Sequence, residues 1–127
     1  MNWTKFLWCA SWDINTCPGE KLRAQYNAMT DANCMNCDKF FHCQGNYDAV
    51  YLCGKTANNI RIAKKISDCR EAAQGGDSAD SQADQRANKF GRDGVTHKTT
   101  IEEINDAIER TFSVPCRHID LCLDLSK

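Results

Sequence analysis

The residues best suited to acid–base chemistry are a histidine and an acidic residue one helical turn before it. Asp38 and His42 are four positions apart, so on a helix their side chains share a face. A carboxylate in that position can fix the tautomer of an imidazole and raise its basicity, as a general base requires. The alternative is a half-buried histidine that is hydrogen-bonded within a helical pair, which is the commoner fate of a lone histidine between Phe41 and Cys43.

Nine cysteines in 127 residues make disulfide bonds the main expectation. Such a density in a short chain is typical of proteins that fold in an oxidising compartment. The rival is a zinc ion held by Cys34 and Cys37, with His42 or Cys43 as a further ligand. The later cysteines do not supply a second close pair, so we expect no metal and no cofactor. Cys43 and Cys69 are almost symmetric about a predicted helix–helix loop, so a disulfide between them is geometrically reasonable, while the connectivity of the cysteines stays open.

A second polar cluster contains three acidic residues that share one face of a predicted helix. Asp77, Asp80 and Asp84 could bind a divalent cation there. A solvated, acidic helix start is the simpler interpretation, because the helix dipole favours negative charge at that end. Arg70 is likewise expected on the solvated side of its own helix.

Helices must position these groups, because apolar residues recur at spacings of three and four along most of the chain. Gly54 can end one helix, while Thr56 and Ser78 can cap the next two. Gly45, inside a predicted helix, indicates a close crossing with another helix. Helices are predicted over residues 20–30, 36–53, 56–73, 78–90 and 100–112, followed by a short strand or extended segment.

These elements define an all-α fold: a small cysteine-rich helical domain with a central antiparallel hairpin formed by residues 36–53 and 56–73, stabilised by disulfides. The length suits a single domain covering residues 1–127. Within it we expect a core over about residues 20–112 and a short extended tail over residues 113–127.

The balance of charges excludes some classes of partner. Sixteen basic and seventeen acidic residues leave a net charge of −1, which provides no field for holding nucleic acid. The first twelve residues contain only a short apolar run, so neither a secretory signal nor a membrane span is predicted. If the chain is exported, another carrier must deliver it.

Three stretches follow one another in an order that resembles a known family. They are residues 38–49 (DKFFHCQGNYDA), residues 63–71 (AKKISDCRE) and residues 77–92 (DSADSQADQRANKFGR). Together, over about residues 34–94, they resemble the variable C-terminal toxin domains of Rhs-type and other polymorphic toxin proteins. The resemblance implies delivery by a secretion system, a cognate immunity protein as partner, and His42, Asp38, Asp84 and Arg92 as the positions to test for catalysis.

The leading hypothesis is therefore a bacterial antagonistic effector, or toxin, that acts in an oxidising, extracytoplasmic location. It would be hydrolytic if His42 serves as a base, and whether the chain is an enzyme is left open. A second hypothesis is a non-catalytic, disulfide-stabilised helical binding or adaptor module. A third is a small zinc-binding protein.

Overall fold

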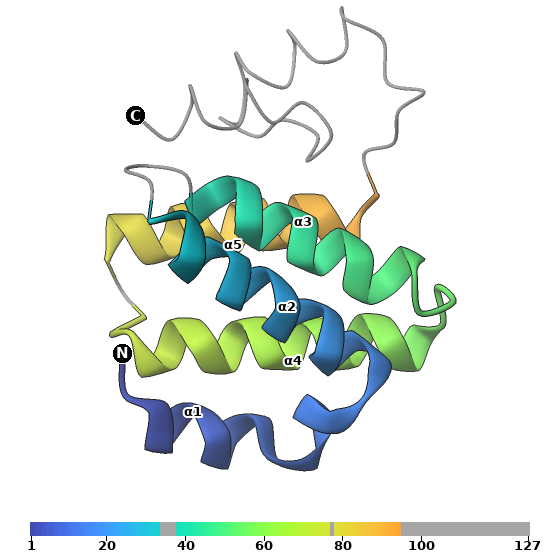
Figure 1. Cartoon of the computed structure of the whole chain (residues 1–127), viewed down its shortest axis with the longest axis horizontal. Coiled ribbons are helices and arrows are strands. Elements are labelled where there is room, and N and C mark those ends of the chain that lie inside the picture. Colours follow the sequence, from blue (N-terminus) through green and yellow to red (C-terminus); the bar gives the residue numbers. More distant parts are fainter. Residues whose placement is uncertain (34–37, 77, 95–127) are drawn as a thin grey trace, which may run out of the picture.

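A computed structural model describes residues 1–33, 38–76 and 78–94, and every regular element within these ranges is a helix (Figure 1). The all-α prediction is confirmed. The predicted helix over residues 100–112 and the extended tail lie outside the described residues. The helices are α1 (Trp3–Ala10), the 3-10 helix η1 (Ser11–Asn15), α2 (Cys17–Ala32), α3 (Asp38–Tyr51), α4 (Ala57–Ala73) and α5 (Ala79–Arg92).

Side-chain caps begin the long helices where the sequence predicted them. Thr56 accepts a hydrogen bond from Asn59 N at 3.1 Å at the start of α4, and Ser78 accepts one from Ser81 N at 3.1 Å at the start of α5. Gly54 has a φ of +83° between α3 and α4, a backbone conformation that glycine adopts without strain. These local signals explain why the helix boundaries were predictable.

Helices α3 and α4 run antiparallel and form the predicted central hairpin (Figure 1). Helix α3 packs mainly against α2 and α5, and α1 lies at the outer side of the bundle against α4. No helix was predicted before residue 20. Even so, Phe6 and Ala10 of α1 are buried with Leu22, Val50 and Ile66 in the apolar core.

Two glycines allow helices to approach α3 closely. A Cβ atom on Gly45 would come within 3.2 Å of both Leu22 and Gln25 of α2, which confirms the predicted close crossing. A Cβ atom on Gly91 of α5 would overlap the carbonyl oxygen of Cys43. Gly91 therefore requires the smallest residue, whereas a larger residue at Gly45 would require Leu22 and Gln25 to shift slightly.

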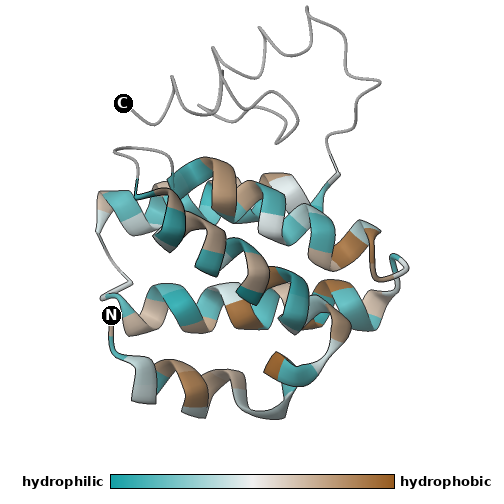
Figure 2. Cartoon of the chain, in the orientation of Figure 1, coloured by the Kyte–Doolittle hydropathy of each residue, from teal (hydrophilic) through white to brown (hydrophobic). Residues whose placement is uncertain are grey.

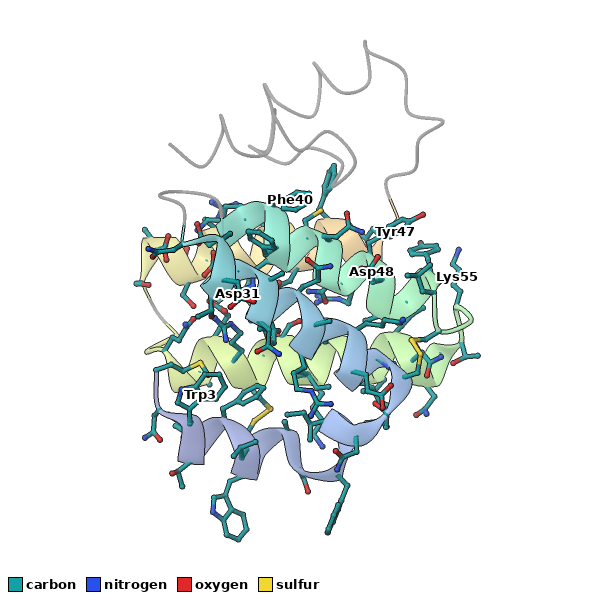
Figure 3. All side chains as sticks on the ribbon, viewed as in Figure 1. Trp3, Asp31, Phe40, Tyr47, Asp48 and Lys55 are labelled. Atoms are coloured by element: carbon teal, nitrogen blue, oxygen red, sulfur yellow. A yellow bond between two sulfur atoms is a disulfide. The ribbon has the colours of Figure 1, made fainter. Side chains whose placement is uncertain are left out.

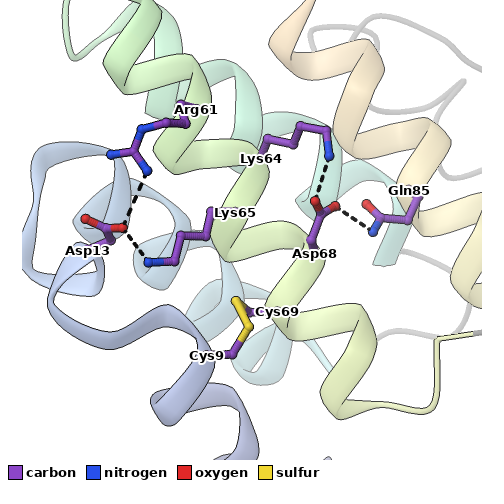
Figure 4. The surroundings of a disulfide bond; sticks show 8 residues. All are labelled: Cys9, Asp13, Arg61, Lys64, Lys65, Asp68, Cys69 and Gln85. Atoms are coloured by element: carbon purple, nitrogen blue, oxygen red, sulfur yellow. Dashed lines mark hydrogen bonds and ion pairs between the residues drawn. A yellow bond between two sulfur atoms is a disulfide. The ribbon is translucent and has the colours of Figure 1, made fainter.

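Two disulfides join the N-terminal segment to the rest of the bundle. Cys9 of α1 pairs with Cys69 of α4, and Cys17 of α2 pairs with Cys53 after α3. The Cα atoms are 5.5 and 5.8 Å apart, respectively, within the usual range. The disulfide considered between Cys43 and Cys69 is wrong, because packing of α1 on α4 places Cys9 beside Cys69 (Figure 4).

Ion pairs accompany the Cys9–Cys69 bond at the same interface. Lys65 Nζ of α4 lies 2.8 Å from Asp13 Oδ2 of η1, and Arg61 of α4 approaches the same carboxylate (Figure 4). The N-terminal segment is thus fixed to α4 by a covalent bond and by ionic contacts. None of the described helices combines the length and the apolar character needed to cross a bilayer.

Candidate functional site

Three of the four predicted catalytic residues lie together between α3 and α5. The ligand atoms of Asp38, His42 and Asp84 all lie within 4.8 Å of one another. Lys39, which the sequence analysis did not single out, is inserted among the acidic side chains. Its Nζ atom lies 2.6 Å from Asp38 Oδ2, 2.5 Å from Asp84 Oδ1 and 2.8 Å from Asp80 Oδ1.

His42 contacts a carboxylate on another helix. Its Nε2 atom lies 3.4 Å from Asp84 Oδ2, and the residue is only 2 % exposed. Burial lowers the pKa of His42 to about 3, and the positive charge of Arg70 acts in the same direction. The imidazole is therefore neutral at pH 7. A base with so low a pKa is weak, so a catalytic role stays a prediction that this geometry leaves untested.

Burial and Lys39 act in opposite directions on the carboxyl groups of this cluster. Burial raises the pKa of Asp84, and the contact with the Lys39 ammonium group acts to lower it. Burial also acts to raise the pKa of Asp38, but hydrogen bonding to Lys39 and Asp84 outweighs it and the net pKa is lowered. A buried acidic cluster with an internal ammonium group shares protons in this way.

Lys39 supplies the cluster's own positive charge. Asp38, His42 and Asp84 are a donor set that a divalent cation could use, but the ammonium group already contacts two of these residues. We therefore interpret Lys39 as an internal counter-ion. The predicted solvated acidic face holds for Asp80, whose side chain is exposed, but is wrong for Asp84, because α3 covers it.

The fourth predicted catalytic residue, Arg92, belongs to a separate polar network. Its Nη1 atom donates to Asn46 Oδ1 at 2.9 Å, and Asn46 also accepts a hydrogen bond from Ser67 and donates one to Asn88. Among the residues that the structure describes, this network touches the first cluster through Asn46 Nδ2, which donates to the backbone oxygen of His42. Arg92 thus joins α5 to α3 without contacting the imidazole.

Arg70 is buried rather than solvated, contrary to the expectation. It is 7 % exposed, and its guanidinium carbon lies 4.2 Å from the centre of the Tyr26 ring. Its Nη1 atom contacts Met1 Sδ at 3.5 Å, and no carboxylate of the described residues lies within ion-pair distance of it. The burial of Arg70 was not predicted because it depends on the position of α2, which covers this side of α4.

The N-terminal helical segment exposes large apolar side chains. Phe6 and Ala10 of α1 face the core, whereas Trp3 is 59 %, Leu7 51 %, Trp8 83 % and Trp12 84 % exposed. We call these four residues the outer face. Figure 2 shows α1 in pale and brown colours with little hydrophilic teal, and α1 borders solvent on the side away from α4. Large apolar side chains that are exposed together on one short segment are typical of an interaction surface.

The fold and its cross-links define a class of protein: a helical bundle whose disulfides fit an extracellular, oxidising location. A family model described as "Serum amyloid A protein" matches residues 15–109. The chain belongs to the serum amyloid A family. The match begins after α1, so the outer face lies before the matched region.

Individual relatives agree with this assignment. The chain is 45 % identical over 80 residues to the serum amyloid A protein of Notamacropus eugenii, covering 60 % of each chain. It is 49 % identical over 72 residues to the serum amyloid A-3 protein of Mesocricetus auratus, covering 54 % of this chain and 57 % of the relative. It is 46 % identical over 79 residues to the serum amyloid A-1 protein of Mus musculus, covering 60 % and 62 %.

The chain thus spans about three fifths of the length of these relatives. No solved structure matches it. The family assignment corrects the resemblance to Rhs-type toxin domains, because the quoted motifs of residues 38–92 lie inside the matched region. The bacterial effector hypothesis is wrong, and with it delivery by a bacterial secretion system and a cognate immunity protein. The adaptor-module and zinc-protein hypotheses also find no support.

Proposed function

We propose that this chain is a secreted lipid-binding protein, an acute-phase apolipoprotein of the serum amyloid A family, and that it attaches to lipid surfaces through the outer face of α1 and η1. The single observation that carries this proposal is the exposure of Trp3, Leu7, Trp8 and Trp12 on one short segment.

The chemistry of the outer face suits the boundary between water and lipid. Tryptophan is enriched at membrane interfaces, and an amphipathic helix lies in that plane with its apolar side in the acyl region. Lys5, which is exposed on α1, can reach the polar head groups from there. Fully burying one large apolar side chain contributes about 1.5–3 kcal/mol, so four of them can hold a small protein on a surface.

A lipid surface fits the outer face better than a rigid protein partner. Trp8 and Trp12 are 83 % and 84 % exposed on the consecutive elements α1 and η1, and a deformable lipid layer accommodates such side chains without a matching cavity. Among the described residues, the other exposed large apolar side chains are Met1, Leu52 and Ile60. Of these three, Met1 adjoins the outer face in sequence, so within the described residues apolar exposure is concentrated near the N-terminus.

The test is flotation with phosphatidylcholine vesicles, comparing the unaltered chain with the double variant Trp8→Ser/Trp12→Ser. Leu52→Ser is the matched control, because Leu52 is 61 % exposed but lies after α3, away from the outer face. We expect the double variant to lose at least ten-fold in vesicle affinity and the control to retain it. Equal affinities would overturn the proposal. So would a lipid-independent dimer that the double substitution dissociates, because the outer face would then be a contact between copies.

A further inference from the structure

Arg70 presents an energetic problem that points to a ligand. It is a buried guanidinium group, its Nε atom has no hydrogen-bond partner, and within the described part of the chain its one hydrogen-bond contact is the thioether sulfur of Met1. Burying a charge is costly unless the charge is paired. Contact with the Tyr26 ring offsets only part of that cost.

None of the described acidic groups that share a cavity with Arg70 forms an ion pair with it, and Asp38, Asp80 and Asp84 pair with Lys39 instead. Glu71 accepts a hydrogen bond from Ser81 Oγ at 3.0 Å, forms no ion pair with Arg70, and has a pKa that burial raises. Burial raises the pKa of Tyr26 to about 12, so its hydroxyl group is neutral at pH 7. Asp31 is exposed, lines the same cavity as Arg70 and forms no ion pair with it.

Two adjoining cavities lie at the end of the bundle where Trp3 and Asp31 are located (Figure 3). One has a volume of about 400 Å³ and contains Arg70 and the polar Thr30. The other has a volume of about 200 Å³ and is lined mainly by apolar side chains, including Phe6 and Ile66. Trp3, Tyr26 and Asn27 line both cavities, so the two lie next to each other.

We propose that these cavities, which we call the Trp3 crevice, form a binding site for one anionic amphiphile with a single hydrocarbon chain. Its carboxylate or phosphate head group pairs with Arg70, and its chain lies in the apolar cavity bounded by Phe6 and Ile66. The crevice has the size and the composition of a small-molecule site, which is mostly apolar with a few placed polar groups. A charge-assisted hydrogen bond to a guanidinium group is among the strongest that proteins form.

This site shares Trp3 and Leu7 with the outer face, but it does not depend on the proposed attachment to lipid surfaces. Trp8 and Trp12 do not line either cavity, and Arg70 is not on the outer face. Only Trp3 and Leu7 contact both regions. Substitutions can therefore remove one property and leave the other.

The test uses dodecanoate below its micellar concentration as the probe. The chain contains three tryptophans, so Trp8→Phe/Trp12→Phe leaves Trp3 as the only fluorescent indole at the crevice. We expect a saturable change in Trp3 fluorescence with a stoichiometry of one, and affinity at least ten-fold lower after Arg70→Gln. Dodecyl phosphate distinguishes phosphate from carboxylate head groups, and dodecanol, which carries no charge, should bind at least ten-fold more weakly than dodecanoate.

Two outcomes would overturn the proposal: dodecanoate binding that Arg70→Gln leaves unchanged, or a fluorescence change that never saturates. If Arg70→Gln fails to fold, equal affinities of the unaltered chain for dodecanoate and dodecanol would overturn it instead. The converse variant, Trp8→Ser/Trp12→Ser, should bind dodecanoate normally while losing vesicles. If the unaltered chain binds dodecanoate but not vesicles, the proposed lipid attachment through the outer face is wrong. If it binds vesicles but not dodecanoate, the proposed site in the Trp3 crevice is wrong.

Discussion

Lys39 Nζ lies 2.5 Å from Asp84 Oδ1, and this contact joins α3 to α5 through side chains that are only 11 % and 5 % exposed. A pair so well shielded from water is costly to break, because removal of one partner leaves the other charge buried. The residues first considered for catalysis thus surround an ionic link between two helices.

Replacing Lys39 should reveal the importance of this link for stability. We expect Lys39→Met to lower the free energy of unfolding by about 3–5 kcal/mol, since Asp38 and Asp84 would lose their buried counter-ion. Urea denaturation followed by circular dichroism measures the change. The matched control is Lys89→Met, which breaks an exposed pair with Asp93 and should cost less than about 1 kcal/mol. Similar losses in both variants would contradict a special role for the buried pair.

His42 should make the protein sensitive to mild acid. The pKa of His42 is about 3 in the folded protein, against a usual value of 6.5. Between pH 6.5 and pH 3, His42 is therefore protonated in the unfolded chain but neutral in the folded chain. Stability from the neutral imidazole is therefore complete above pH 6.5 and declines towards pH 3, by about 1.4 kcal/mol per pH unit. The stability difference between the unaltered chain and His42→Gln, measured from pH 7.5 to 4.5, should follow this decline. A constant difference would show that the imidazole does not titrate this way.

The crossing of α5 over α3 should not tolerate a methyl group. Gly91→Ala would place a Cβ atom against the Cys43 carbonyl oxygen, and the helices would have to separate, with a loss of about 1–3 kcal/mol or more. Gly76→Ala is the control, because its added Cβ atom would meet its nearest neighbours at an ordinary 3.8 Å. Thermal unfolding of both variants measures the difference, and an unchanged midpoint for Gly91→Ala would refute the close contact.

The disulfide between Cys9 and Cys69 should stabilise the bundle substantially. The cysteines are 60 residues apart, and the loss of chain entropy for such a loop corresponds to about 4 kcal/mol. We expect Cys9→Ser/Cys69→Ser to lose stability of this order and to increase hydrogen exchange in α1 above all. Exchange that remains slow in α1 would mean that noncovalent packing, including the Asp13–Lys65 pair, holds the helix unaided.

The sequence predicted the helices well because their signals are local. Caps at Thr56 and Ser78 and the turn at Gly54 depend on neighbours a few positions away. Gly45 predicted a crossing because glycine is unfavourable in a helix unless space demands it. The family could not be identified from these local signals. The order of the motifs within residues 38–92 alone led to the wrong family, and comparison over residues 15–109 identified the right one.

Burial of charge could not be predicted in the same way. Lys39 and Arg70 have the residue type of a solvated helix face, and only the positions of α5 and α2 show that they are covered. Asp84 was expected at a solvated helix start for the same reason. The partner of Cys69 also depended on packing, because α1 had not been predicted as a helix.

The bond between Cys9 and Cys69 closes most of the described chain into a covalent ring. A protease that cuts once at any peptide bond between these two residues therefore releases no fragment, because both products remain joined through sulfur. Cleaved molecules would keep their intact mass, apart from one added water, until a reductant separates the pieces. In an extracellular fluid that contains proteases, the ring preserves covalent continuity after the first cut.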